Sequence, residues 1–124
     1  MALVTLKKRQ DFLRLRGGAR FVTPGFVLEA KPQLEGAGCG PSPRFGFTVT
    51  KATGAAVVRN RIRRRLRAAV RLIAPDKARA GHDYVLIARA AALERSFPDL
   101  KKDLERALQR VHDPAGPEGR ARDR

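Results

Sequence analysis

Apolar residues recur at helical spacing through the middle of the chain. If each residue advances by about 100°, one side of the stretch around 59–71 becomes a continuous apolar stripe. Its members are Val58, Ile62, Leu66, Ala69, Val70 and Ile73. This pattern predicts a helix that packs on a core and ends before Pro75.

Two further segments carry helix signals. Residues 6–16 have Thr5 as a candidate N-cap and Gly17-Gly18 as a stop. Residues 97–111 follow Ser96 as N-cap, with Asp99 as the acid of a capping box. Their predicted buried stripe is Leu100, Leu104, Ala107, Leu108 and Val111.

Three segments read as strands. Residues 26–31 alternate, and 84–88 form an apolar run that fits a strand buried near the centre of a sheet. Residues 45–51 alternate strictly. Their predicted core positions are Phe45, Phe47 and Val49, and Gly46, Thr48 and Thr50 should face a groove or solvent. Phe21, Phe26 and Phe97 are predicted mostly as core residues.

The predicted order of elements is α-β-β-α-β-α. It favours an α/β (α+β) two-layer sandwich in which the central helix crosses over between two strands that could lie parallel. The length suits one domain, which we place at residues 1–112. The Pro, Gly and charged residues of 113–124 predict a flexible tail.

The net positive charge of the chain indicates which class of partner it binds. The chain carries 27 Lys and Arg against 12 Asp and Glu, a net charge of +15 on 124 residues. Nucleic acid is the expected partner of such a chain. No apolar run reaches the roughly 18 residues of a membrane span, and the amino terminus lacks a signal-peptide pattern. We therefore expect a cytoplasmic protein without a membrane partner.

The central helix concentrates this charge. Seven of the thirteen residues in 59–71 are arginine and none is acidic. Asn60, Arg63, Arg64, Arg67 and Arg71 share one sector, and Arg61 and Arg65 flank the apolar stripe on its other side. Like charges four residues apart repel, so an external polyanion is the favoured partner, with a solvated basic face as the alternative.

The sequence indicates no metal site and no catalytic site in the protein itself. Cys39 is the single cysteine, and His82 and His112 are isolated in the sequence, so no zinc site is expected. Asp99 and Asp103 lie beside Lys101 and Lys102 and read as capping and surface charge. No histidine–lysine or carboxylate set suits RNA cleavage by the protein itself.

One combination of motifs resembles a known family. The run 45–51, then Gly54, then 56–67 with Arg-Asn-Arg at 59–61, resembles the signature of the protein subunit of bacterial ribonuclease P. Asp11-Phe12 and the segments 26–28 and 83–89 extend the resemblance over roughly residues 6–111.

The resemblance implies a fold and a function. The fold would contain an unusual left-handed βαβ crossover. The chain would join a large catalytic RNA that removes the 5′ leader from precursor tRNA, and this RNA with Mg²⁺ would perform the phosphodiester hydrolysis. The protein alone would be non-catalytic, would bind no cofactor tightly and would have no small-molecule substrate.

The resemblance also assigns two surfaces. Together with the helix pattern it predicts contacts to the catalytic RNA from Arg59, Asn60, Arg61, Arg63, Arg64, Arg65, Arg67 and Arg71. A leader-binding cleft would contain Phe12 as a stacking residue, lined by Lys8, Arg9, Arg16, Thr48, Thr50, Lys51 and Arg89. A core-packing role for Phe12 beside Leu15 is the alternative.

The sequence departs from the family pattern at three positions, and two alternative functions stay open. Arg16 and Glu29 stand where the family commonly has aromatic residues, and Ala52 replaces a second lysine, so the predicted cleft is poor in aromatics. A ribosomal or chaperone-like RNA-binding protein without a role in cleavage is one alternative. A DNA-binding module is another, although the helix offers Asn60 alone for reading bases.

Overall fold

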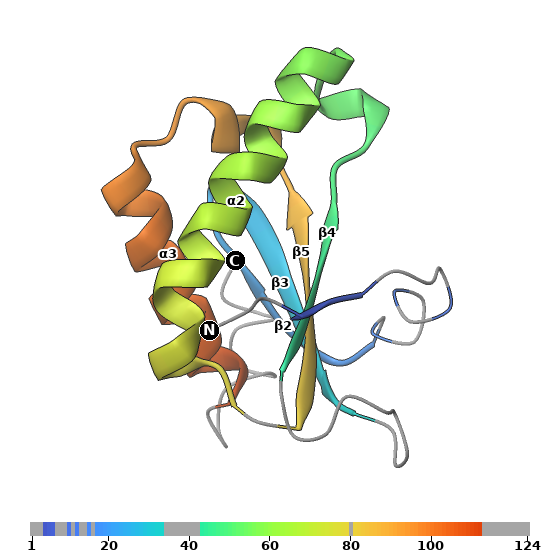
Figure 1. Ribbon diagram of the computed structural model, residues 1–124, viewed down its shortest axis with the longest axis vertical. Helices are drawn as coiled ribbons and strands as arrows, with labels where there is room; N and C mark the ends of the chain where they lie inside the picture. The colour runs from blue at the N-terminus through green and yellow to red at the C-terminus, as the bar shows by residue number, and fades with distance from the viewer. Residues whose placement is uncertain are drawn as a thin grey trace.

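A five-stranded sheet covered on one face by two long helices forms the body of the molecule (Figure 1). The computed structural model describes residues 4–6, 10, 12, 15, 17–33, 43–79 and 81–112. The strands are β1 (Val4–Thr5), β2 (Ala19–Val22), β3 (Phe26–Pro32), β4 (Arg44–Thr48) and β5 (His82–Ala88). The helices are η1 (Lys51–Thr53), α2 (Ala56–Lys77), η2 (Ala90–Leu93) and α3 (Phe97–Val111), where η marks 3-10 turns.

Strand β5 occupies the centre of the sheet, whose order is β1-β4-β5-β3-β2. It runs parallel to β4 and antiparallel to β3. Its residues Tyr84, Val85 and Leu86 are buried. The prediction of a central strand buried on both faces is therefore confirmed, because helices cover one side and a smaller apolar cluster covers the other.

The connection from β4 to β5 is left-handed. The two strands are neighbours that run in the same direction, joined through η1 and α2. In Figure 1 both strands run upward, α2 descends on their left, and β4 lies nearer to the viewer than β5. The chain thus turns anticlockwise as it recedes, whereas nearly all such units are right-handed. The crossover implied by the resemblance is confirmed.

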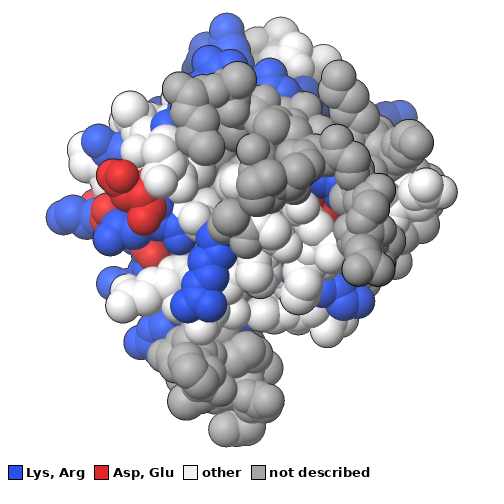
Figure 2. Space-filling view, turned by 60° about the horizontal axis from the view of Figure 1, so that its bottom comes forward, with Lys and Arg blue, Asp and Glu red and all other residues white. Residues whose placement is uncertain are grey.

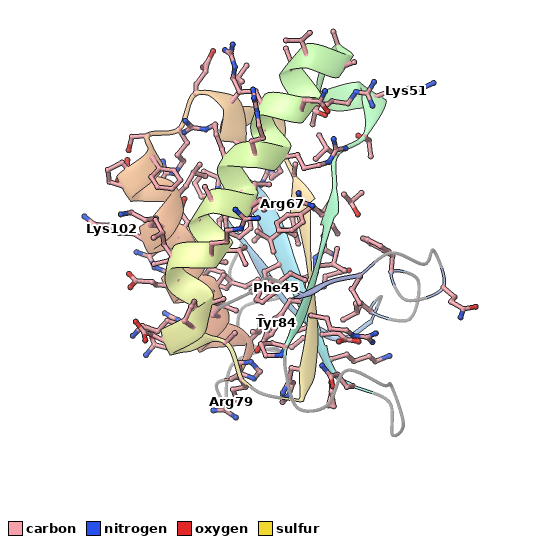
Figure 3. The ribbon with its side chains drawn as sticks, viewed as in Figure 1. Phe45, Lys51, Arg67, Arg79, Tyr84 and Lys102 are labelled. Atoms are coloured by element: carbon pink, nitrogen blue, oxygen red, sulfur yellow. The ribbon has the colours of Figure 1, made fainter. Side chains whose placement is uncertain are left out.

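The main core lies between the sheet and the two helices. The stripe of α2 is buried at Ile62, Leu66, Ala69 and Val70, and it meets the predicted stripe of α3, which is buried throughout. Phe45 stacks on Tyr84 with ring centroids 4.8 Å apart (Figure 3). Ser96 caps α3 by accepting a hydrogen bond from the Asp99 N–H, as predicted.

A second, smaller cluster covers the other face of the sheet. Leu6, Leu15 and Val85 are buried there, with Phe12 and Ile87 packed against them. The ring of Phe12 lies so close to Gly46 that a Cβ at that position would approach its Cε2 atom to 2.6 Å. A side chain at this position of β4 would therefore displace the Phe12 ring, whereas glycine lets the ring lie directly on the strand.

Several predicted boundaries were wrong. α2 continues through Pro75, which costs one main-chain hydrogen bond in the last turns, while the burial of Ala74 holds that end on the core. The strand predicted over 45–51 ends at Thr48, and η1 follows. The short strands β1 and β2 were not predicted. Of the predicted helix 6–16, most residues lie outside the described ones, and Gln10 and Phe12 have helical geometry.

Asp103 corrects another expectation. It was predicted as surface charge, but it is 7 % exposed and forms a salt bridge with Arg95, whose Nε lies 2.6 Å from Asp103 Oδ2. A second contact joins Arg95 Nη2 to Asp103 Oδ1 at 3.1 Å. This hydrogen bonding raises the pKa of the Arg95 guanidinium above its ordinary value. The pair fixes the segment between η2 and α3.

Candidate nucleic-acid interface

The turn before α2 sets where the arginine-rich helix begins. Gly54 has φ +143°, a conformation that L side chains rarely adopt, and a Cβ there would meet Val58 at 3.0 Å. The Nε of Arg59 donates to the main-chain oxygen of Gly54 at 3.2 Å. These contacts join the Gly-containing turn to the first turn of α2.

Polar and cationic side chains of α2 form one outward surface, which we call the arginine face. Its exposed members are Asn60, Arg61, Arg64, Arg67 and Arg71, and Arg59 and Arg63 are half-buried. A hollow of about 360 Å³ opens in this face. The hollow, called the α2 hollow below, is lined by Val57, Asn60, Arg63, Arg64 and Arg67.

Two contacts orient side chains of the arginine face. Arg63 donates from Nη1 to the Asn60 Oδ1 atom at 3.0 Å. Arg67 extends from α2 toward β4 (Figure 3), and its guanidinium lies over the ring of Phe47, 5.8 Å from the centroid. A cation held over an aromatic face gains electrostatic energy. Both contacts limit the positions that these guanidinium groups adopt.

Arg65 is placed differently from the other arginines of α2. It is half-buried and donates from Nε to the main-chain oxygen of Ala92 at 3.1 Å. Its Nη2 also donates to the main-chain oxygen of Arg95. These bonds join α2 to the segment before α3. The role of Arg65 as an RNA contact stays a prediction, and the structure adds a structural role to it.

The predicted leader cleft lies on the opposite face of the sheet. Strand register places Thr48 of β4 beside Ile87, which in turn lies beside Val27 of β3. Arg89 is exposed at the end of β5 and donates from Nη1 to the main-chain oxygen of Thr23 at 3.2 Å. Phe12 lies on the same face, half-buried against Gly46. The structure thus brings Phe12, Thr48 and Arg89 to one surface.

The remaining predicted cleft residues are less closely grouped. Thr50 and Lys51 are exposed beyond the end of β4, and Lys51 points away from the sheet in Figure 3. Glu29, the departure from the family pattern, is buried in β3. Lys8, Arg9 and Arg16 lie outside the described residues.

The two histidines are neighbours at the lower end of the sheet, which corrects their treatment as isolated residues. His82 and His112 meet edge to face with ring centroids 4.7 Å apart. The Nε2 of His112 lies 2.6 Å from the Tyr84 hydroxyl, which also accepts a hydrogen bond from the Arg79 N–H at 2.9 Å. Burial lowers the pKa of His112 to about 4 and raises the pKa of Tyr84 to about 12.

Sequence reasoning missed this cluster because its members are far apart along the chain. Only the packing of the end of α3 against the start of β5 brings the rings together. No group of three or more His, Cys, Asp or Glu side chains that could hold a metal ion occurs among the described residues.

Acidic side chains are unevenly distributed at this end. Figure 2 looks at the lower end of the molecule and shows Asp and Glu gathered on the side of α3, whereas Lys and Arg reach several parts of the outline. The visible surface on the side of α3 therefore carries charges of both signs, in contrast to the arginine face of α2. In the described part of the chain, no helix is long and apolar enough to cross a membrane.

A family model described as ribonuclease P matches residues 2–112. The chain belongs to the ribonuclease P protein family. The matched residues include every strand of the sheet together with α2 and α3.

Curated relatives agree with this membership. The chain is 42 % identical over 119 residues to the ribonuclease P protein component of Erythrobacter litoralis, covering 96 % of this chain and 94 % of the relative. It is 49 % identical over 107 residues to the ribonuclease P protein component of Paramagnetospirillum magneticum, covering 86 % of this chain and 80 % of the relative.

Solved structures of ribonuclease P proteins share the fold. The Staphylococcus aureus protein superposes with a TM-score of 0.70 at 27 % identity, covering 87 % of this chain and 94 % of that chain. The Thermotoga maritima protein superposes with a TM-score of 0.72 at 24 % identity, covering 88 % of this chain and 98 % of that chain. The ribonuclease P fold thus extends over most of this chain.

Proposed function

We propose that this chain is the RNA-binding subunit of a cytoplasmic ribonuclease P. It binds the catalytic RNA through the arginine face of α2 and the 5′ leader of precursor tRNA through the opposite sheet face. The assembled ribonucleoprotein removes the leader by endonucleolytic cleavage and so makes the mature 5′ end of tRNA. The protein itself supplies binding and positioning.

The observation that carries this proposal is the unneutralised charge of α2. Among the described residues, the arginines that form salt bridges with carboxylates are Arg44 and Arg95, and neither lies on α2. Arginine suits phosphate because its planar fork donates two parallel hydrogen bonds. A chain of phosphates along a structured RNA would neutralise the whole face and release counterions.

Recognition through this face depends on backbone and shape. The deep, narrow major groove of an A-form helix hides the base edges from side chains, so phosphates and unpaired nucleotides remain as contacts. The leader is single-stranded, and an aromatic ring such as Phe12 on an open sheet face suits stacking of a base. The two surfaces lie on opposite sides of the sheet and can be occupied together.

The chemical step belongs to the RNA in this proposal. Mg²⁺ would be held mainly by the RNA subunit and would activate the water that cleaves the phosphodiester bond. Two buried carboxylates of the described residues are engaged in salt bridges. Asp83 is fully buried and pairs with Arg44 across β4 and β5, and Asp103 pairs with Arg95.

A competition experiment separates this function from its rivals. The full chain is bound to labelled bacterial ribonuclease P RNA, and three unlabelled competitors of equal phosphate number are added: the same RNA, a ribosomal RNA fragment and duplex DNA. We expect unlabelled ribonuclease P RNA to release the labelled RNA at the lowest competitor concentration. Equal competition by ribosomal RNA would favour the ribosomal or chaperone-like alternative, and stronger competition by DNA would favour a DNA-binding module.

A further inference from the structure

Val57 is an apolar residue in a cationic setting. Among the described residues, Val57 and Leu72 are the large apolar side chains most open to solvent, at 70 % and 58 % exposure, and both lie on α2. Val57 lines the α2 hollow together with Asn60 and three arginines, whereas Leu72 does not. An exposed apolar side chain surrounded by cations matches a ligand with an apolar face and an attached anion.

Three of the side chains that line the α2 hollow have partners within the protein. Asn60 Oδ1 already accepts from Arg63, which leaves the amide nitrogen of Asn60 to donate to a bound group. Arg67 is held over Phe47 on the side toward β4. Side chains fixed before binding lose less conformational entropy when the ligand arrives.

We propose that the α2 hollow binds the base of one unpaired nucleotide of the catalytic RNA. Val57 contacts the face of the base, the Asn60 amide donates to its edge, and the neighbouring arginines hold the flanking phosphates. The volume of about 360 Å³ is at the small end of ligand-binding clefts, as expected for a single nucleotide. This inference rests on the proposed function, because it takes the catalytic RNA as the occupant of the arginine face.

An unpaired nucleotide fits this site better than a paired one. Bases within an A-form helix are stacked and their major-groove edges are inaccessible, whereas loops and bulges present free base faces. The apolar contact adds affinity that does not depend on salt, in contrast to the phosphate contacts. The two kinds of contact can therefore be separated by a salt series.

The test compares two exposed apolar positions of the same helix. Val57→Ala and the control Leu72→Ala are titrated with bacterial ribonuclease P RNA at several KCl concentrations, after circular dichroism has shown that both variants fold. We expect Val57→Ala to weaken binding about three- to ten-fold at every concentration with an unchanged slope, since two methyl groups leave the contact. Leu72→Ala should bind as the unsubstituted chain does.

Base-specific chemical probing of the bound RNA provides a second readout. The unsubstituted chain should protect at least one unpaired nucleotide, and Val57→Ala should restore its reactivity while Leu72→Ala should not. The inference would be overturned if Val57→Ala bound with unchanged affinity, if both variants lost affinity equally, or if the protected nucleotides were the same with and without Val57→Ala. Each of these outcomes would leave the proposed function standing. If the unsubstituted chain failed to bind the RNA, both proposals would fall.

Discussion

The guanidinium of Arg65 donates from Nε to the main-chain oxygen of Ala92 at 3.1 Å, so an arginine of α2 serves as a link to the neighbouring segment. The next residue toward the amino terminus, Arg64, is exposed and lines the α2 hollow. Adjacent arginines of one helix therefore have different environments. Substituting each in turn should separate the stability of the fold from the binding of RNA.

Arg65→Ala should destabilise the protein by about 1 to 3 kcal/mol, because two main-chain oxygens lose a charged donor. Chemical denaturation measures this loss. Arg64→Ala is the matched control and should change the free energy of unfolding by less than about 0.5 kcal/mol, as expected of an exposed position. Equal stability of the two variants would show that the bonds of Arg65 contribute nothing to the fold.

The arginine face should govern the salt dependence of RNA binding. Replacing Arg59, Arg63 and Arg67 with alanine should weaken binding and lower the slope of log affinity against log salt by up to about three units. The affinity for ribonuclease P RNA, measured between low and moderate KCl, gives this slope. An unchanged slope would mean that these side chains meet solvent rather than phosphate.

Protonation of His112 should destabilise the fold in acid. The pKa of His112 is about 4 in the folded chain and ordinarily 6.5, because burial disfavours its charged form and His82 and Arg79 lie nearby. The unfolded chain then binds the proton more readily. The stabilisation of the folded chain by neutral His112 is therefore complete above about pH 6.5 and decreases as the pH falls toward 4.

Melting temperatures between pH 7.5 and 4.5 test this prediction. The unsubstituted chain should lose more stability over this range than His112→Gln, which keeps a polar partner for the Tyr84 hydroxyl. Carboxylates also titrate in this range, so the difference between the two curves is the informative quantity. Parallel curves would contradict the prediction.

Phe12 offers a test of the leader surface. Its ring packs on Gly46 and is half-buried, so Phe12→Leu should retain an apolar contact there while removing the aromatic face. Binding of precursor tRNA by the assembled ribonucleoprotein should become less favourable by about 1 to 3 kcal/mol of free energy, the usual contribution of one stacked base. Mature tRNA, which has no leader, serves as the control ligand. A similar loss for both ligands would assign Phe12 to packing alone.

Local patterns predicted the elements whose signals lie within one segment. The stripe of α2, the Ser96 cap of α3 and the buried run of β5 all follow from periodicity or capping, and the structure confirms them. β1 pairs only two residues with β4, which is too short to leave a pattern in the sequence. Pro75 predicts the end of the helix because a proline lacks the main-chain N–H, but the burial of Ala74 keeps the last turns on the core.

Long-range contacts account for what the sequence could not predict in and around the candidate site. Arg61 and Arg65 occupy the same side of the predicted helix, and only the position of η2 makes Arg65 a structural donor. The sequence around Asp103 predicts a surface charge, because the salt bridge with Arg95 depends on the turn before α3. The pairing of His82 with His112 depends on the sheet and α3 together, which no single segment encodes.

Cleavage of a precursor tRNA by bacterial ribonuclease P RNA at low Mg²⁺ tests the central claim most directly. The reaction is run with the RNA alone, with this chain alone and with both. Cleavage at the mature 5′ end should appear only when RNA and chain are combined. If the chain binds the RNA but never restores cleavage, it is not the subunit proposed here.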